Sequence, residues 1–509
     1  MASAGTSPSP AQGPAHLHDD LRSHLTTLGW WVSSPFTTVR SHWLAEGEQR
    51  LDASYYAGEV FAAQRILGDC GYEVRNLGQL TREVFTLGRF RRVYADGRSS
   101  GWPYLSASDA LAFRPESDRW IARDHAPKPA ARHFAQRGWM LLSCSGSVGR
   151  TVLVTPRLEQ FFLTHDLARL VPAEWPPVGY LYAYLSSWIG QALLSKDQYG
   201  GPIKHLEPHH IAGVPVPLVC TEEQQAIHEQ IIRAYTLRDE ANDLLDDAGA
   251  LLRERLQIPA FDEALVPYLP APRQTWAGQP PMPHPRAFAV SASELGDRLD
   301  ASYHVPVART VVALLRGGCW PLARLGDLAD SIVLPPRFKR IYVTKVHGVP
   351  FLRPSHLPEM RPHDLGHIAR RTPELDALLL NYGDVLVTTD GTVGRVAVVS
   401  SYIAGWAGSN NIARITYGHA DGCNGYLAAF LSSPYGRHQM MREIYGGVVD
   451  HIEVANIEGV LVPTPPTETQ AEVGRCVVQA FERKDEASRL EEEAIHRLEA
   501  LLDRRDDER

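Results

Sequence analysis

The sequence lacks the features of a membrane-spanning or secreted protein. It has no run of eighteen apolar residues, so no segment predicts a membrane span. Residues 1–20 contain neither a basic stretch nor an apolar core, so they do not resemble a secretion signal. Small residues and prolines predict a disordered tail over residues 1–35. These features predict a cytoplasmic protein without a membrane partner.

Cysteine is scarce, and its spacing argues against two kinds of site. The six cysteines include no CxxC pair, so neither a zinc ribbon nor a redox dithiol is expected. Free thiols in a reducing compartment are the simplest interpretation. The 21 histidines show no HExxH or other ordered metal spacing, so no metal site is predicted.

Enzyme motifs are also missing. The nearest match to the Asn/Asp-Pro-Pro-aromatic motif of adenine methyltransferases is Ser433-Pro434-Tyr435, which has one proline and lies in a repeated framework. No Walker GxxxxGK[ST] motif and no nucleophile elbow occurs. Glu482-Arg483-Lys484 imitates a nuclease Glu-x-Lys but has no matching upstream acidic partner. We therefore predict no catalytic residues and no cofactor on this chain.

The net charge of −8 is concentrated in two segments. Residues 221–257 and 467–509 each have a net charge of −5. Residues 50–218 hold nineteen basic and fifteen acidic residues, and residues 298–466 hold sixteen and fourteen. These two parts are mildly basic, which permits contact with DNA but does not predict strong nonspecific binding.

The chain contains one module twice. The order of the matching segments never changes, and the shift between copies stays at 245 to 248 residues. We therefore predict two domains related by a pseudo-twofold axis rather than a solenoid. The matching segments are 50–55 with 298–303, 89–94 with 337–342, 146–150 with 391–395, 185–187 with 431–433, and 199–201 with 445–447.

Each copy ends in the same way. A strand-like stretch, 213–219 or 459–465, leads through Thr221 or Thr467 into a long helical pattern, and both threonines are expected N-caps. Each helix has an apolar stripe that must pack against another surface. We expect the two helices to pair antiparallel, and packing of each helix on its own domain is the alternative. The stripe residues are Ala234, Leu237, Ala241, Leu244, Ala248 and Leu251, then Ala480, Ala487, Leu490, Ala494 and Leu501.

Proline density over residues 259–285 predicts a semi-rigid connector between the copies. The predicted fold is α+β, with two tandem target-recognition domains, each followed by a long helix, and with the helices paired as an antiparallel coiled coil. The predicted segments are a tail (1–35), domain 1 (36–219), spacer helix 1 (220–257), a connector (258–287), domain 2 (288–466) and spacer helix 2 (467–509).

The ordered set of motifs resembles the specificity (S) subunit of type I restriction–modification systems. The motifs of the second copy are Gly383-Asp384-Val385-Leu386, Asp390 to Arg395, Leu431 to Ser433, Gly446-Gly447, and Glu468 with Gln470; the first copy has Gly138 to Leu141, Gly146 to Arg150, and Glu222 to Gln225. The resemblance implies that each domain reads one half of a bipartite DNA target. It also implies that the paired helices set the half-site separation and dock methyltransferase subunits, of which we expect two. S-adenosylmethionine is then expected on those partners, and a restriction subunit is a further expected partner.

Two basic clusters are the first candidates for contact with double-stranded DNA, because Arg and Lys bind phosphates and Arg can pair with guanine. If the first cluster lies on a strand, alternation puts Phe90 with Arg92 on one face and Arg89 with Arg91 on the other. A solvated basic strand or loop without a DNA contact is the alternative. The cluster residues are Arg89, Arg91 and Arg92, then Arg337, Lys339 and Arg340.

Two further repeated motifs are candidates. The Gly-x-Val-Gly-Arg segments predict hairpin turns, whose Ser147 or Thr392 hydroxyl could bind phosphate, followed by Arg150 or Arg395. The Tyr-Gly-Gly loops are suited to backbone contact, and a purely structural loop is the alternative. The residues flanking these loops are Lys196, Tyr199 and Lys204, then Arg442 and Tyr445, whereas His205 and His451 are expected to be structural.

Three other functions stay open. A specificity subunit of another methylation-linked phage-defence assembly would have the same sequence features. A scaffold that binds protein rather than DNA would also use repeated domains. A self-contained enzyme is disfavoured by the missing motifs.

Overall fold

The computed structural model describes residues 53–95, 97–200, 203–262, 265–268, 287–296, 298–418, 422–446 and 449–503. The predicted tail, the start of domain 1 and most of the proline-rich connector lie outside the described residues. Gly201 and Gly447 of the Tyr-Gly-Gly loops also lie outside them.

The first half of the chain forms two four-stranded sheets and one two-stranded sheet. Its strands are β1 (Glu73–Asn76), β2 (Thr81–Phe85), β3 (Tyr94–Ala95), β4 (Gly101–Leu105), β5 (Trp120–Ala122), β6 (Met140–Ser143), β7 (Thr151–Leu153), β8 (Phe162–Leu163), β9 (Leu167–Pro172) and β10 (Pro215–Leu218). The sheet orders are β2-β9-β6-β7, β3-β5-β4-β8 and β1-β10. Every residue of β6 is buried, as expected for a short continuous apolar run.

The second half repeats these sheets strand for strand. Their orders are β12-β19-β16-β17, β13-β15-β14-β18 and β11-β20. The recurrence in sequence is therefore a recurrence in topology. The strands are β11 (Leu322–Arg324), β12 (Ser331–Val333), β13 (Tyr342–Val343), β14 (Gly348–Leu352), β15 (His367–Ala369), β16 (Val385–Thr388), β17 (Val396–Val398), β18 (Ala407–Gly408), β19 (Ile412–Thr416) and β20 (Leu461–Pro463).

Helices lie between and after these strands, and five of the seven helices described in the first half recur in the second at the shift of the repeat. In the first half they are α3 (Gly58–Asp69), α4 (Ala107–Ala110), α5 (Pro156–Glu159), α6 (Val178–Ser186), α7 (Trp188–Lys196), α8 (Pro208–Ala212) and α9 (Thr221–Leu256). In the second half they are α10 (Ala301–His304), α11 (Pro306–Arg316), α12 (Leu325–Leu328), α13 (Leu375–Leu378), α14 (Cys423–Ser432), α15 (Pro434–Arg442), α16 (Val454–Glu458) and α17 (Thr467–Asp503). No helix among the described residues is long and apolar enough to cross a bilayer.

The strand-to-helix transitions at β10 and β20 lie where the sequence predicts them, but the predicted N-caps are wrong by one residue. The carbonyl of Cys220 accepts the first helical hydrogen bond, from the amide of Gln224, so Cys220 is the N-cap and Thr221 the first helical residue. The amide of Gln470 bonds to the carbonyl of Pro466 in the same way. In the described residues around Cys220, no side chain caps the start of α9.

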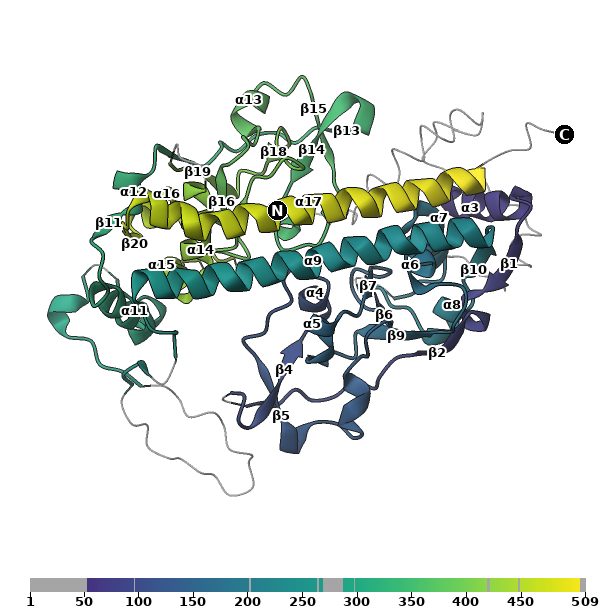
Figure 1. Cartoon of the computed structure of the whole chain (residues 1–509), viewed down its shortest axis with the longest axis horizontal. Coiled ribbons are helices and arrows are strands. Elements are labelled where there is room, and N and C mark those ends of the chain that lie inside the picture. Colours follow the sequence, from purple (N-terminus) through teal and green to yellow (C-terminus); the bar gives the residue numbers. More distant parts are fainter. Residues whose placement is uncertain are drawn as a thin grey trace, which may run out of the picture.

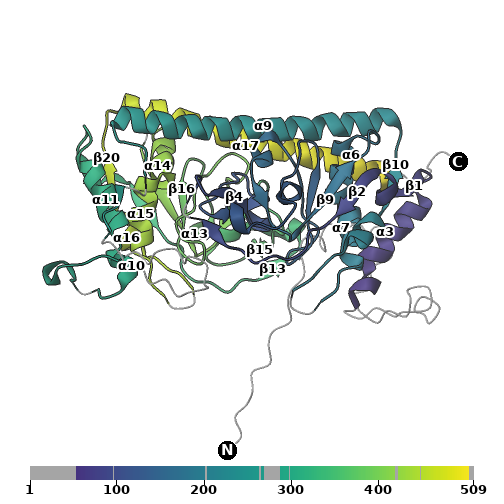
Figure 2. The same cartoon turned by 90° about the horizontal axis from the view of Figure 1, so that it is seen from below.

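The long helices α9 and α17 lie side by side and run in opposite directions (Figure 1). Arg497 pairs with Glu223 at 2.6 Å, whereas Arg255 pairs with Glu472 at 2.7 Å, so the far end of one helix meets the near end of the other. Both sets of sheets lie on the same side of this helix pair (Figure 2).

Small residues line the seam between the two helices. Ala234 and Leu237 form one cluster with Ala487, and Ala241 forms another with Ala480. These five side chains are fully buried. Small side chains allow the two backbones to approach closely. Of the other predicted stripe residues, the buried ones are Ala248, Ala494 and Leu501, and the half-buried ones are Leu244, Leu251 and Leu490.

Each long helix also completes the core of the opposite half. Leu498 and Leu502, near the end of α17, belong to the first-half core together with Ile227 and Ile231. Leu252, near the end of α9, belongs to the second-half core that contains Val473 and Tyr426. Both halves therefore depend on apolar side chains from the distal end of a helix that begins in the other half.

Candidate nucleic-acid interface

The first basic cluster is a loop anchored by one aromatic ring. Residues 86–93 form no strand or helix, so the condition for strand alternation is not met and the segment is a loop. The Phe90 ring turns inward and its centre lies 5.8 Å from that of the buried Phe162. An alternating strand would turn Arg92 inward beside Phe90, whereas this loop exposes every base of the cluster. The exposed bases are Arg89, Arg91 and Arg92.

The second basic cluster has the same design. Residues 334–341 form no strand or helix, and the Phe338 ring centre lies 5.9 Å from that of Phe351. Phe351 is fully buried, so the aromatic residue again anchors the loop. The exposed bases are Arg337, Lys339 and Arg340.

In each cluster the last base is held in place by the domain. The Arg92 guanidinium lies 5.6 Å from the centre of the Tyr104 ring and 3.3 Å from the Asp166 carboxylate. Arg340 lies 5.4 Å from the centre of the Phe351 ring. Within the described residues, the earlier bases of both clusters form no ion pair. Those bases are therefore available to an external anion.

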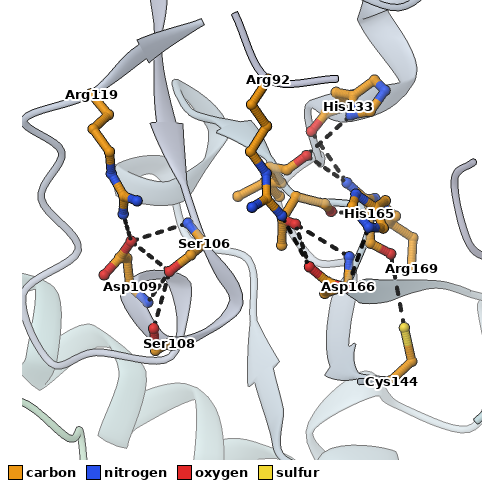
Figure 3. A network of polar contacts seen from close by, with 12 residues as sticks. Arg92, Ser106, Ser108, Asp109, Arg119, His133, Cys144, His165, Asp166 and Arg169 are labelled. Carbon is orange, nitrogen blue, oxygen red and sulfur yellow. Dashed lines mark hydrogen bonds and ion pairs between the residues drawn. The ribbon is translucent and has the colours of Figure 1, made fainter. Parts of the chain in front are cut away.

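A network of polar contacts holds the residues that lie beside Arg92 (Figure 3). Arg169, which is fully buried, donates to the carbonyl of Thr164 at 3.0 Å and fixes the segment that carries Asp166. His133 stacks on Phe162 and lies 3.1 Å from the Leu163 carbonyl. Burial lowers the pKa of His133 to about 4, so its ring is neutral near pH 7.

The predicted hairpins are confirmed in both halves. Strand β6 pairs antiparallel with β7, and β16 pairs antiparallel with β17. Gly146 and Gly149 have φ of +79° and +90° at the first tip, a backbone conformation that other residues rarely adopt. The Ser143 hydroxyl donates to the backbone carbonyl of Ser147, and the Ser147 side chain is exposed. Thr392 is exposed in the same way at the second tip.

The structure brings each hairpin tip against the Tyr-Gly-Gly loop. The Gly146 amide donates to the Lys204 carbonyl at 3.0 Å, and the Gly391 amide donates to the Asp450 carbonyl at 2.9 Å. Each basic loop is bonded to the segment beside the hairpin: Arg92 donates to Asp166, and Arg340 donates to Asn410. The Asp166 carbonyl accepts from the Cys144 amide, and the Asn411 carbonyl accepts from the Thr389 amide, both at 3.0 Å.

Tyr199 and Tyr445 are held by carboxylates. The Tyr199 hydroxyl donates to Glu207, and this hydrogen bond raises the pKa of Tyr199. The Tyr445 hydroxyl donates to Glu453 at 2.7 Å, and partial burial with this bond raises the pKa of Tyr445 to about 12. Both phenols are thus protonated donors near pH 7, already engaged within the loop.

Arg150 and Arg395 follow equivalent hairpins but differ in surroundings. Arg150 forms an ion pair with Glu359 of the second half at 3.1 Å, and its side chain is 19% exposed. Arg395 is exposed and forms no ion pair within the described part of the chain. Arg395 is therefore the better placed of the two to meet a phosphate.

Lys196 and Arg442 hold the start of each module. The Lys196 ammonium lies 4.7 Å from the Tyr55 ring centre, and the Arg442 guanidinium lies 4.1 Å from the Tyr303 ring centre. These cation–π contacts connect the end of α7 or α15 to the repeated Arg-Leu-Asp-Ala-Ser-Tyr motif. The tyrosine in that motif therefore has a structural partner.

The repeated histidines close the Tyr-Gly-Gly loops. The His205 amide donates to the Tyr199 carbonyl at 2.8 Å, and His451 does the same with Tyr445 at 2.9 Å. The His451 ring also lies 2.7 Å from the Asp390 carboxylate at the hairpin tip. These contacts agree with the predicted structural role.

Two repeated contacts were not predicted. Asp239 of α9 accepts from Thr155 at 3.1 Å, and Asp485 of α17 accepts from Ser400 at 2.6 Å, so each helix holds the segment that follows its hairpin. The aspartates recur at the shift of 246, which was a usable signal within the acidic faces. Within the described residues, no group of three or more His, Cys, Asp or Glu side chains could hold a metal ion.

Comparisons with known proteins found solved structures of type I restriction–modification S subunits. No family model and no curated protein sequence matches the chain. The S subunit from M. genitalium is 11% identical, with a TM-score of 0.34, over 85% of this chain and 95% of that one. The HsdS subunit from Thermoanaerobacter tengcongensis is 16% identical, with a TM-score of 0.26, over 85% and 96%. A chain from a type I restriction–modification complex is 16% identical, with a TM-score of 0.26, over 85% and 97%.

Proposed function

We propose that this chain is a DNA sequence-recognition subunit that reads a bipartite, asymmetric target for a partner methyltransferase. One observation carries the proposal: in each half a glycine-rich hairpin tip is bonded to a Tyr-Gly-Gly loop, and an exposed basic loop is bonded to the segment that pairs with the base of that hairpin. Backbone amides, hydroxyls and basic side chains are the groups that bind DNA phosphates. Base selection then falls to side chains that differ between the halves.

The proposed organisation has two target-recognition domains, 36–219 and 288–466, related by a pseudo-twofold axis. Spacer helices within 220–257 and 467–509 pair as an antiparallel coiled coil and hold the domains at a fixed separation, and segment 258–287 connects the halves. The ion pairs between α9 and α17 support this pairing. Two domains on one rigid spacer bind half-sites at a matching separation.

The two half-sites should differ in sequence. Lys204 in the first half corresponds to Asp450 in the second, so the two Tyr-Gly-Gly loops carry opposite charge. Arg150 is paired, whereas Arg395 is exposed. Different charge at equivalent positions favours different bases and different groove shapes.

The chain is proposed to be non-catalytic and to bind no cofactor of its own. Methylation then belongs to the partner subunits, two of which fit a twofold arrangement, and they would use S-adenosylmethionine. A restriction subunit or another defence effector is an optional further partner.

The deciding experiment is to co-express the chain with its methyltransferase and sequence the modified bases in the host DNA. We expect one split motif with a fixed spacer and two different halves. Reversing the charge of the basic loops, at Arg89, Arg91, Arg337 and Lys339, should abolish modification. Unchanged methylation in that variant would favour a protein-binding scaffold instead.

A further inference from the structure

Two equivalent loops, one from each half, meet on the helix pair. In the first half, loop A (residues 106–116) follows β4, and in the second half, loop B (residues 353–363) follows β14. Phe113 and Met360 each come nine residues after an aromatic residue that is buried in its sheet. At the repeat shift the two loops share only a serine and an Arg-Pro pair, and they occupy equivalent places in the repeat.

The contact between the loops is a direct backbone pairing. The Phe113 amide donates to the Pro358 carbonyl at 2.7 Å, and Ala112 forms an antiparallel bridge with Glu359. Phe113 is buried with Ala241 of α9 and Ala480 of α17, and Met360 packs against this cluster. The first domain, the second domain and both helices therefore share one small core.

Each loop is also tied by charge to its own helix. Arg114 donates to Asp246 of α9 at 2.6 Å. Arg361 lies 3.3 Å from Glu491 and 3.6 Å from Glu492 of α17. The two arginines are equivalent in the repeat, and so are Asp246 and Glu492, so these ties are related by the internal symmetry.

One ion pair breaks this symmetry and crosses between the halves. Arg150, at the base of the first hairpin, pairs with Glu359 of loop B at 3.1 Å, and the side chains are 19% and 13% exposed. The Glu359 carboxylate also accepts from the His363 amide at 2.7 Å, which fixes its orientation. The equivalent arginine, Arg395, faces no such partner within the described residues, because Ala112 stands where Glu359 does.

We propose that loops A and B form an inter-domain lock in which Glu359 and Phe113 are positioning residues that set the half-site spacing. In this view the spacer helices alone do not determine the spacing: the hairpin of the first domain is bonded directly to the second domain. A change of domain separation must break the Phe113–Pro358 hydrogen bond and separate the half-buried Arg150–Glu359 pair. This inference rests on the proposed function for its DNA consequence but not for the existence of the lock.

The test compares Glu359→Arg, which places like charges together, with the double variant R150E/E359R, which restores an opposite pair. The control is Glu174→Arg, which breaks the exposed Arg82–Glu174 pair within the first domain. All variants are studied as full chains with the methyltransferase bound. Duplexes carry both half-sites, identified from the wild-type methylome, at the native spacing and at one or two base pairs more or fewer.

We expect the wild type and Glu174→Arg to prefer the native spacing by about tenfold or more, which corresponds to about 1.4 kcal/mol. Glu359→Arg should reduce that preference to about threefold or less, and the double variant should recover it. Amide hydrogen exchange, measured without DNA, should become faster across residues 109–116 and 356–363 in Glu359→Arg alone. Recovery in the double variant also shows that Arg150 is not needed as a DNA contact.

The outcomes separate the two proposals. Unchanged exchange in Glu359→Arg overturns the lock. Faster exchange with an unchanged spacing preference overturns its role in spacing, as does failure of the double variant to recover the preference while exchange is restored. A wild type that modifies no split motif overturns the proposed function, and the exchange measurement then still decides whether the lock exists.

Discussion

Arg238 of α9 and Glu491 of α17 form an ion pair in which each side chain is only 4% exposed. The same carboxylate accepts from the Tyr182 hydroxyl at 3.0 Å and lies 3.3 Å from Arg361. The Coulomb attraction of Arg238 and Arg361 holds the pKa of Glu491 below its usual range although burial acts against this. One charge thus connects both helices with a side chain from each domain.

Removing the charge of Glu491 should lower the free energy of unfolding. Glu491→Gln leaves two arginines near an uncharged amide, and an unpaired buried charge costs about 3 kcal/mol of unfolding free energy. The measurement is denaturant unfolding of the full chain. Asp69→Asn, which breaks the exposed Arg65–Asp69 pair, is the control and should cost about 0.5 kcal/mol or less. A decrease below about 1 kcal/mol for Glu491→Gln would show that the network rearranges.

His133 should make stability depend on pH. Its pKa is lowered by burial to about 4 in the folded chain, against about 6.5 when unfolded. Between these values the unfolded chain binds a proton that the folded chain does not, so stability is full above about pH 6.5 and falls towards pH 4. The total decrease reaches about 3 kcal/mol.

The test of this pH dependence is His133→Phe, which keeps the stacking on Phe162 but cannot be protonated. Its stability should fall less than that of the wild type between about pH 6.5 and 4, as followed by thermal unfolding. The exposed His496→Asn is the control and should follow the wild type. If the stability of His133→Phe and that of the wild type fell equally with pH, His133 would not be the group responsible for the pH dependence.

The basic loops should determine how DNA binding depends on salt. The double variant R89A/R91A removes two exposed cations, so the slope of log K against log salt should fall by about 1 for each phosphate that the loop no longer neutralises. Anisotropy titrations over a range of salt concentrations measure the slope. Arg65→Ala on α3 is the matched control and should leave it unchanged. An unaltered slope for the double variant would place the DNA elsewhere.

Alanine substitution at two helix glycines should change the free energy of unfolding in opposite directions. A Cβ at Gly474 of α17 would overlap the Gly422 carbonyl oxygen, so Gly474→Ala must push α14 away and should cost more than about 2 kcal/mol. Gly249 of α9 has only the flexible Arg253 side chain within 4 Å. Gly249→Ala should therefore stabilise the chain by about 0.5 to 1 kcal/mol. Urea unfolding of both variants measures the two changes, and equal effects would contradict the packing.

Local patterns in the sequence were sufficient for the hairpins and the long helices. Apolar runs and glycine spacing locate β6 with β7 and β16 with β17, and the apolar stripe locates α9 and α17. The helix starts are off by one residue, because the choice between Cys220 and Thr221 depends on which carbonyl accepts the bond from Gln224. Neighbouring residues in the sequence do not determine that choice.

Tertiary contacts explain what the sequence did not reveal. The sequence left open whether the segment around Phe90 is a strand or a loop, and it is a loop whose Phe90 ring packs on Phe162, which lies 72 residues later. Arg150 looked equivalent to Arg395 because the repeat makes them so, and only the position of Glu359 separates their surroundings. Loops A and B share only a serine and an Arg-Pro pair at the repeat shift, and this match does not indicate that the two loops contact each other.

The exchange of helix ends between the halves has a consequence for synthesis. Ile495, Leu498 and Leu502 fill the core of the first domain, although the ribosome makes them more than 200 residues after the strands they cover. The first domain therefore emerges with an apolar surface that stays open until translation passes residue 502. We expect chaperones to bind such a nascent chain, and we expect the closure of α17 onto both halves to be its last folding step.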